Sequence, residues 1–184
     1  MKKILAFGAS NSKTSINKAL AVYAANQLLK VEVTVADLND YASPLYSVDL
    51  EKEHGIDENA LRFFELIKKN DAIVLSVAEY NGLHTSAFKN LWDWLSRIPM
   101  DKPFNIWDGK PMFLLSTSIS RRSKNNVLKV SKELFPNFGA HIIADFYLPS
   151  FNYFFKAGQI VEAKYLLKFE EQKNRFQQHL DQMN

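Results

Sequence analysis

The chain has 184 residues, a length that suits one domain with a sizeable buried core. Its 47% apolar and 23% charged residues are ordinary for a globular protein, and its net charge of +3 comes without a long basic run, which argues against a nucleic-acid binder. The absence of cysteine excludes thiol catalysis, disulfides and cysteine-ligated metals.

Membrane insertion and export have no support in the sequence. No apolar run approaches the roughly 18 residues that cross a bilayer. The apolar stretch near the N-terminus, Ile4 to Phe7, is shorter than a signal peptide needs. We therefore expect a cytoplasmic protein without a membrane partner.

Strand and helix patterns alternate along the chain. Residues 3–8 form an apolar run typical of a buried strand, and residues 16–29 carry apolar positions at helical spacing behind Ser15 as N-cap. A long connection covers residues 38–56. Further strands are expected at 31–37, 72–77, 110–116 and 141–148. Further helices are expected at 58–69, 86–97, 124–135 and 159–183.

This alternation predicts a single α/β domain over residues 1–184. Five strands with intervening helices favour a three-layer sandwich, in which a parallel sheet is covered by helices on both faces. Ligands of such sheets bind beyond the carboxyl ends of the strands. The informative loops are those after the first, third and fourth strands.

The loop after the first strand is rich in hydroxyl groups. Ser10, Ser12, Thr14 and Ser15 lie within it, and it leads directly into a helix N-terminus. Hydroxyl donors and free helical N–H groups together suit a phosphate, although an ordinary serine-capped turn fits the same residues. Since Gly8 is the only glycine of this loop, neither a P-loop nor a dinucleotide fingerprint is present. A cradle for a terminal phosphomonoester is the functional interpretation.

The loop after the third strand places an aromatic residue before a tight turn. Tyr80 is followed by Asn81 and Gly82, and the glycine lets backbone N–H groups approach a ligand closely. Such a turn could stack on a flat heterocycle and hydrogen-bond to it. A plain Asn-Gly turn without a ligand is the alternative.

This segment resembles the flavin-binding loop and following helix of the NAD(P)H-dependent FMN reductases. Those proteins carry Pro-Glu-Tyr-Asn-Gly and then Leu-Lys-Asn…Asp-Trp-Leu-Ser-Arg. The matching residues are Glu79, Tyr80, Asn81, Gly82, Lys89, Asn90, Asp93, Trp94, Leu95, Ser96 and Arg97. The family's first loop is matched by Ser10, Ser15, Ile16 and Asn17. The resemblance covers roughly residues 1–150.

The resemblance implies a flavodoxin-like fold with strand order 2-1-3-4-5, bound FMN, and NADPH or NADH as electron donor. It implies a small-molecule acceptor, such as a free flavin, a quinone or an azo compound, and needs no metal or protein nucleophile. The residues that it assigns to the FMN phosphate are Ser10, Ser12, Ser15, Ile16 and Asn17. Those expected near the ring are Glu79, Tyr80, Asn81, Gly82 and Ser118.

The sequence departs from the family pattern at several positions. Ser12 stands where the family usually has an arginine, and Lys13 beside it could supply a point charge. Ala78 replaces the motif's proline, and the loop at 117–123 has no glycine. Arg121 and Arg122 in that loop could meet the 2′-phosphate of NADPH or form a solvated basic turn.

Two alternatives to an enzyme stay open: a flavin-binding electron carrier, which the positive net charge disfavours, and a relative that has lost the cofactor. His84, next to the flavin loop, could line the pocket. The helix at 86–97 is apolar around its circumference, with Trp92 and Trp94 among its residues. One face would then be free for a second copy, so a homodimer or homotetramer is expected.

Overall fold

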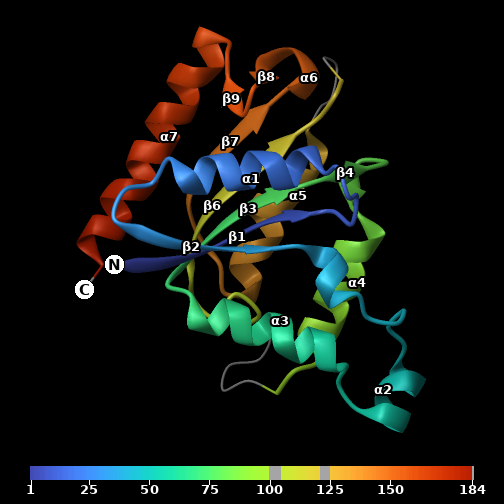
Figure 1. Ribbon diagram of the computed structural model, residues 1–184. Helices are drawn as coiled ribbons and strands as arrows, with labels where there is room; N and C mark the ends of the chain where they lie inside the picture. The colour runs from blue at the N-terminus through green and yellow to red at the C-terminus, as the bar shows by residue number, and fades with distance from the viewer. Residues whose placement is uncertain (100–104, 121–124, 184) are drawn as a thin grey trace.

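The computed structural model describes residues 1–99, 105–120 and 125–183. Its centre is a five-stranded parallel sheet in the order β2-β1-β3-β6-β7 (Figure 1), which confirms the predicted order. The strands are β1 (Lys2–Ala9), β2 (Val31–Ala36), β3 (Ala72–Val77), β6 (Pro111–Thr117) and β7 (His141–Leu148).

Helices connect these strands. They are α1 (Ile16–Asn26), α2 (Val48–His54), α3 (Glu58–Lys69), α4 (Ser86–Leu95), α5 (Asn126–Leu134), α6 (Phe151–Phe154) and α7 (Ala163–Gln182). Two 3-10 turns are η1 (Leu38–Tyr41) and η2 (Phe135–Phe138). Two small antiparallel hairpins pair β4 (Glu79–Tyr80) with β5 (Leu83–His84) and β8 (Phe155–Lys156) with β9 (Gln159–Ile160).

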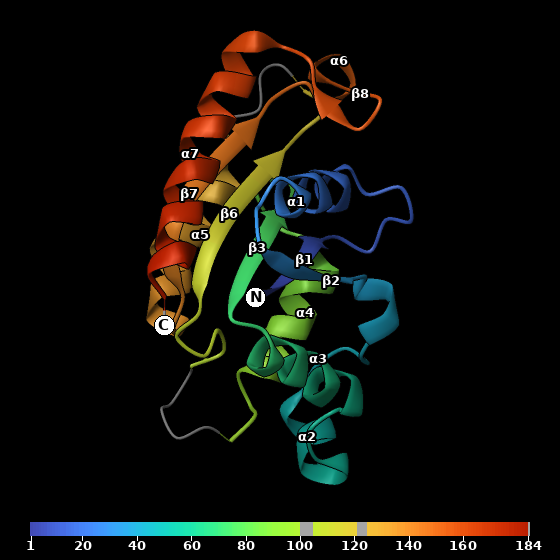
Figure 2. The ribbon, with the colours of Figure 1, turned by 60° about the vertical axis from the view of Figure 1, so that its left-hand side comes forward.

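The sheet is buried on both faces, as its apolar strands require. In β1, Leu5 and Phe7 belong to the core shared with α3, α4 and α5, whereas Ile4 and Ala6 belong to the core under α1 and α7. Figure 2 shows these helices in two layers on either side of the sheet. The carboxyl ends of β1, β3 and β6 meet at one edge of this sandwich, where the loops with the motifs begin.

The C-terminal element differs from the prediction. The expected helix at 159–183 begins only at Ala163, because residues 159–160 form strand β9 instead. The β8–β9 hairpin turns through Ala157 and Gly158, whose φ angles are 48° and 78°. The spacing of apolar residues along the sequence does not reveal such a hairpin, because its side chains pack against residues distant in sequence, such as Phe155 against Tyr23.

Helix α4 also corrects an expectation. Its large apolar residues are all buried within the chain: Leu91, Trp92, Trp94 and Leu95. The ring of Trp92 packs edge-on against Phe135 and Phe138, both from η2, at 5.0 Å between centroids. The predicted free apolar face of this helix therefore does not exist, and the argument from it for a second copy is wrong.

Candidate functional site

A cleft of about 400 Å³ lies at the carboxyl edge of the sheet, where the loops after β1, β3 and β6 meet. Its lining is Ser10, Ser12, Thr14, Ser15, Ile16, Asn17, Ala78, Glu79, Tyr80, Thr117, Ser118 and Ile119. The structure thus brings together residues up to about a hundred positions apart.

Most of the predicted site residues line this cleft; Asn81 and Gly82 do not. Sequence reasoning did not select Ala78, Thr117 or Ile119, and it named Thr14 only as a loop hydroxyl. Ala78 directly follows β3, Thr117 ends β6 and Ile119 comes two residues later, so the rule that ligands lie at strand carboxyl ends could have found them.

One end of the cleft is the N-terminus of α1. The helix begins close against β1 because residue 8 has no side chain: a Cβ on Gly8 would lie 2.3 Å from the backbone nitrogen of Lys18. The Ser15 hydroxyl caps the helix by accepting from Lys18 N–H at 3.1 Å. Within the described part of the chain, the N–H groups of Ile16 and Asn17 have no hydrogen-bond acceptor. They are therefore free to meet an anion, and the helix dipole favours one there.

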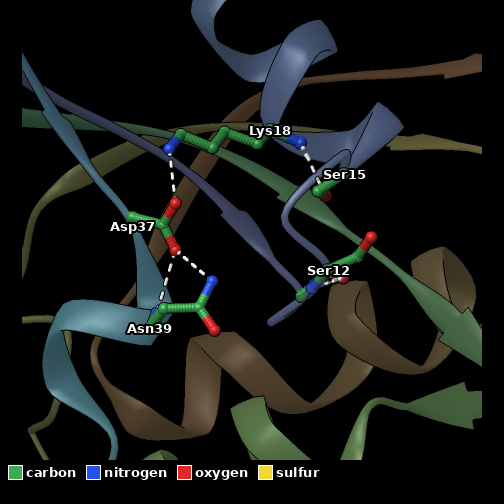
Figure 3. A network of polar contacts seen from close by, with 6 residues as sticks. Ser12, Ser15, Lys18, Asp37 and Asn39 are labelled. Atoms are coloured by element: carbon green, nitrogen blue, oxygen red, sulfur yellow. Dashed lines mark hydrogen bonds and ion pairs between the residues drawn. The ribbon is translucent and has the colours of Figure 1, made fainter.

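The nearby cations do not point into this cleft. Lys18 reaches from α1 to Asp37 at the end of β2, with 2.6 Å between Nζ and Oδ2 (Figure 3). The hydrogen bond from Lys18, and a second from Asn39 N–H, hold the pKa of Asp37 below its usual value. Lys13 lines a neighbouring cleft of about 630 Å³ instead. An anion in the 400 Å³ cleft would therefore meet N–H groups and hydroxyls, and the described residues that line it include no lysine or arginine.

The hydroxyl loop is itself ordered by internal hydrogen bonds. Ser10 Oγ accepts from Ser12 N–H at 3.2 Å, and Ser12 C=O accepts from Ser15 N–H at 3.1 Å. Ser10 keeps its hydroxyl hydrogen for another partner, since accepting a bond leaves the O–H donor unused, and Ser12 makes both of these bonds with its backbone, which leaves its hydroxyl available. The loop therefore presents two donors beside the two free N–H groups of α1.

The side chain of Asn17, a residue predicted at the phosphate, is hydrogen-bonded to the sheet. It is buried, and its Oδ1 accepts from Ser76 Oγ at 2.8 Å and from Thr117 N–H at 3.1 Å. Those partners belong to β3 and β6. Asn17 thus joins α1 to the sheet beneath the cleft, and only its backbone N–H remains for a ligand.

The segment after β3 folds into the β4–β5 hairpin. Asn81 and Gly82 occupy its two central positions with φ angles of 53° and 86°, as a type I′ turn requires. Tyr80, at the start of the turn, is 51% exposed and lines the cleft. The predicted tight turn is present, and its aromatic side chain is available for a flat ligand.

Glu79 and His84 point toward α5. Glu79 Oε2 accepts from Val127 N–H at 2.9 Å. His84 Nε2 lies 2.8 Å from Ser131 Oγ, and its ring stacks on Phe135. Burial, with a smaller effect from Lys89, lowers the pKa of His84 to about 4, so the ring is neutral near pH 7. His84 does not line the cleft.

A further part of the lining comes from the end of β6. Ser118 Oγ lies 2.8 Å from the hydroxyl of Tyr147 and donates to Ser120 C=O at 3.0 Å. Ile119 is 67% exposed at the rim. Arg121 and Arg122, for which a 2′-phosphate contact was one expectation, lie outside the described residues.

The site fits a flavin mononucleotide by the chemistry of its donors. Free N–H groups and serine hydroxyls gather at one end, and an exposed tyrosine with an Asn-Gly turn stands at the other.

No group of three or more histidine or acidic residues able to hold a metal occurs among the described residues. Likewise, none of the helices described could span a membrane.

Comparison with known proteins identifies the family of the chain. The family model for NADPH-dependent FMN reductases matches residues 2–153. The fold is flavodoxin-like, and the chain belongs to the NADPH-dependent FMN reductase family. The resemblance seen in the sequence motifs is confirmed.

Two curated relatives match part of the chain. A quinone reductase from Escherichia coli is 36% identical over 76 residues, which are 41% of this chain and 38% of the relative. An NAD(P)H-dependent FMN reductase from Pseudomonas aeruginosa is 34% identical over 91 residues, 50% of this chain and 45% of the relative. The matched segments thus span less than half the length of either relative.

Solved structures share the whole fold. The flavoenzyme NAD(P)H:(acceptor) oxidoreductase FerB from Paracoccus denitrificans superposes with a TM-score of 0.74 at 21% identity, covering 98% of both chains. An azoreductase from Bacillus anthracis gives 0.62 at 16% identity, covering 97% of this chain and 100% of that one. At these identities, the likeness establishes the fold.

Proposed function

We propose that this protein binds FMN in the 400 Å³ cleft and acts as an NAD(P)H-dependent oxidoreductase on a small-molecule acceptor. The observation that carries the proposal is the pairing of an anion site with Tyr80, the first residue of the Asn-Gly turn, in a single cleft. Family membership supports the same reaction class. A quinone, a free flavin or an azo compound would be the acceptor, as the names of its relatives suggest.

The residues would divide the work by position. The N–H groups of Ile16 and Asn17 and the hydroxyls of Ser10 and Ser12 would hold the phosphate. When bound, FMN would supply the redox chemistry, the two-electron transfer between the nicotinamide and the acceptor.

The ring end of the cleft would control how the flavin is oriented. Tyr80 would contact its face or edge, and the backbone of the hairpin would offer hydrogen bonds to its polar rim. The Ser118 hydroxyl, held by Tyr147, would provide a further polar contact on the opposite wall. A donor fixed near the ring favours the negative charge that reduction creates there, which is electrostatic preorganisation.

Two further properties belong to this proposal. A homodimer or homotetramer is proposed on the family resemblance, since α4 provides no free apolar face for it. Static light scattering at micromolar concentration decides it: a species of 21.2 kDa alone rejects an oligomer. A cytoplasmic location follows from the need for NAD(P)H as cosubstrate.

Flavin titration tests the cofactor. Fluorescence quenching should show FMN binding tighter than FAD and at least tenfold tighter than riboflavin, because each hydrogen bond to a charged phosphate contributes about 1.5–3 kcal/mol. Steady-state oxidation of NADPH and NADH with a soluble quinone then tests the activity. Tight FMN binding without turnover would identify a carrier, and no flavin binding at all would identify a relative that has lost the cofactor.

A further inference from the structure

The β4–β5 hairpin is fastened to α5 by two side chains from one of its faces. Glu79 and His84 are direct partners across the hairpin, so their side chains project on the same side. Both reach α5. Tyr80 and Leu83 form the other cross-strand pair and are 51% and 58% exposed. The hairpin therefore has one face on α5 and one face toward solvent, and Glu79 and Tyr80, neighbours in β4, both border the cleft.

The two contacts meet on a single residue of α5. Glu79 Oε2 accepts from Val127 N–H at 2.9 Å, while Ser131 Oγ donates to Val127 C=O at 2.7 Å. Because that bond uses the only hydroxyl hydrogen of Ser131, His84 Nε2 must donate to Ser131 Oγ across their 2.8 Å separation. Glu79, Val127, Ser131 and His84 thus form a closed ring of contacts, which we call the hairpin clasp.

Helix α5 lacks a cap of its own. Its N-cap residue, Asn125, has left-handed backbone geometry and makes no side-chain capping bond. The N–H of Val127 is one of the early helical donors that have no partner inside the helix. A carboxylate from the hairpin takes that place, and its charge also suits the positive end of the helix dipole. The hairpin and α5 therefore stabilise each other.

We propose that Glu79 and His84 are positioning residues for the Tyr80–Leu83 turn, which they hold against α5 so that its backbone faces the flavin ring. In this role both act through the turn: His84 does not line the cleft, and Glu79, which borders it, has its Oε2 bonded to Val127 N–H. The inference rests on the proposed function, in which this turn meets the ring. It adds the physical means by which a two-residue turn, exposed on one face, keeps a fixed orientation.

Amide exchange in the flavin-free protein tests the clasp itself. Among the described residues, Glu79 is the acceptor of Val127 N–H, so the exchange rate of this amide measured by NMR should rise at least tenfold in Glu79→Ala. Glu79→Gln keeps an acceptor oxygen and should leave the rate within about threefold of wild type. Glu133→Gln removes an exposed carboxylate from the same helix and is the matched control. Unchanged Val127 exchange in Glu79→Ala overturns the clasp.

Bound flavin tests the positioning role. At saturating FMN, the midpoint potential of Glu79→Ala should become more negative, since a loosened turn gives the reduced ring a poorer donor. Glu79→Gln should restore the wild-type potential. FMN and riboflavin should weaken by the same factor, because the phosphate end is untouched. An unchanged potential in a variant with fast Val127 exchange would refute the positioning role.

Ser131→Ala provides a second variant if Glu79→Ala folds poorly. It removes the link between His84 and Val127 but leaves Glu79 in place, so its change in potential should have the same sign and be smaller. No flavin binding by the wild-type protein would reject the proposed function and the positioning role with it. The exchange result would then stand as a contact between the hairpin and α5, which keeps the two failures distinct.

Discussion

The side chain of Asn17 holds both backbone groups of Thr117: its Oδ1 accepts from the N–H at 3.1 Å, and its Nδ2 donates to the C=O at 3.4 Å. These residues are 100 positions apart. One belongs to the first turn of α1 and the other ends β6, so the loops at opposite walls of the cleft share a single amide.

We predict that Asn17→Ala lowers the free energy of unfolding by about 2–4 kcal/mol. The Ser76 hydroxyl and the Thr117 N–H are both buried and would lose their acceptor, at about 1–3 kcal/mol each. Urea unfolding followed by circular dichroism measures this loss. Asn174→Ala on the exposed side of α7 is the control and should change stability by less than about 0.5 kcal/mol. An equally small loss for Asn17→Ala would mean that this buried network contributes little.

We predict that Ser12→Arg tightens FMN binding about fivefold, or roughly 1 kcal/mol, by replacing a neutral donor with a charged one. The part of the cleft lining that the structure describes has no cationic side chain, and Lys13 lines the neighbouring cleft. The gain should shrink with added salt because it is Coulombic and partly exposed. Dissociation constants at low and high salt measure it, with Gln178→Arg on α7 as a charge-matched control. Weaker binding at low salt would show that the loop has no room for the guanidinium.

His84 makes stability depend on pH in a defined window. Its pKa is about 4 in the folded protein and about 6.5 when unfolded, so between these values the unfolded chain binds more protons. The stability that the neutral His84 contributes is therefore fully present above about pH 6.5 and is lost as the pH drops toward 4. The full shift corresponds to about 3 kcal/mol, and partial exposure of the ring reduces the expected loss to roughly 1–2 kcal/mol.

The variant His84→Gln isolates this contribution, because glutamine offers an N–H donor and does not titrate. The difference in unfolding free energy between pH 7 and pH 4.5 should be smaller for His84→Gln than for wild type. His141→Gln, which removes an exposed histidine, should retain the wild-type difference. The same pH dependence in all three proteins would assign it to other groups.

Gly8→Ala should be far more damaging than Gly109→Ala. A Cβ at residue 8 would lie 2.3 Å and 2.7 Å from the N and Cα of Lys18, so α1 would have to move away from β1. Gly109 has a φ of 70° with open space around it, and alanine there meets only backbone strain of about 1 kcal/mol. Thermal unfolding compares the two. Because the displaced segment carries the free N–H groups, Gly8→Ala should also weaken FMN binding, and unchanged binding would contradict the assigned anion site.

The sheet order and the position of the cleft could be predicted because they depend on local signals. Apolar strand runs such as 72–77 and capped helices fix the alternation, and strand carboxyl ends then define where ligands bind. The motif loops also folded as expected: Asn81 and Gly82 form the turn, and Ser15 caps α1.

Side-chain direction was not predictable in the same way. Asn17 and Glu79 lie in the expected loops, yet their side chains bind partners far along the chain. Asn17 accepts a hydrogen bond from β6, and Glu79 accepts one from α5. Trp92 is buried because η2 packs over it. These contacts depend on how elements dock in three dimensions, which periodicity along one helix does not report.

The burial of the tryptophans gives the protein an optical property of its own. Trp92, Trp94 and Trp107 are all buried, so indole emission should appear at short wavelength and shift to the red only on unfolding. A flavin in the cleft absorbs in that emission range, so its binding would quench the tryptophan fluorescence without any added label. The centroid of the Trp92 ring lies 5.5 Å from that of His84, and a protonated imidazole quenches indole light. The intensity should therefore fall as the solution approaches pH 4, reporting the charge state of one histidine.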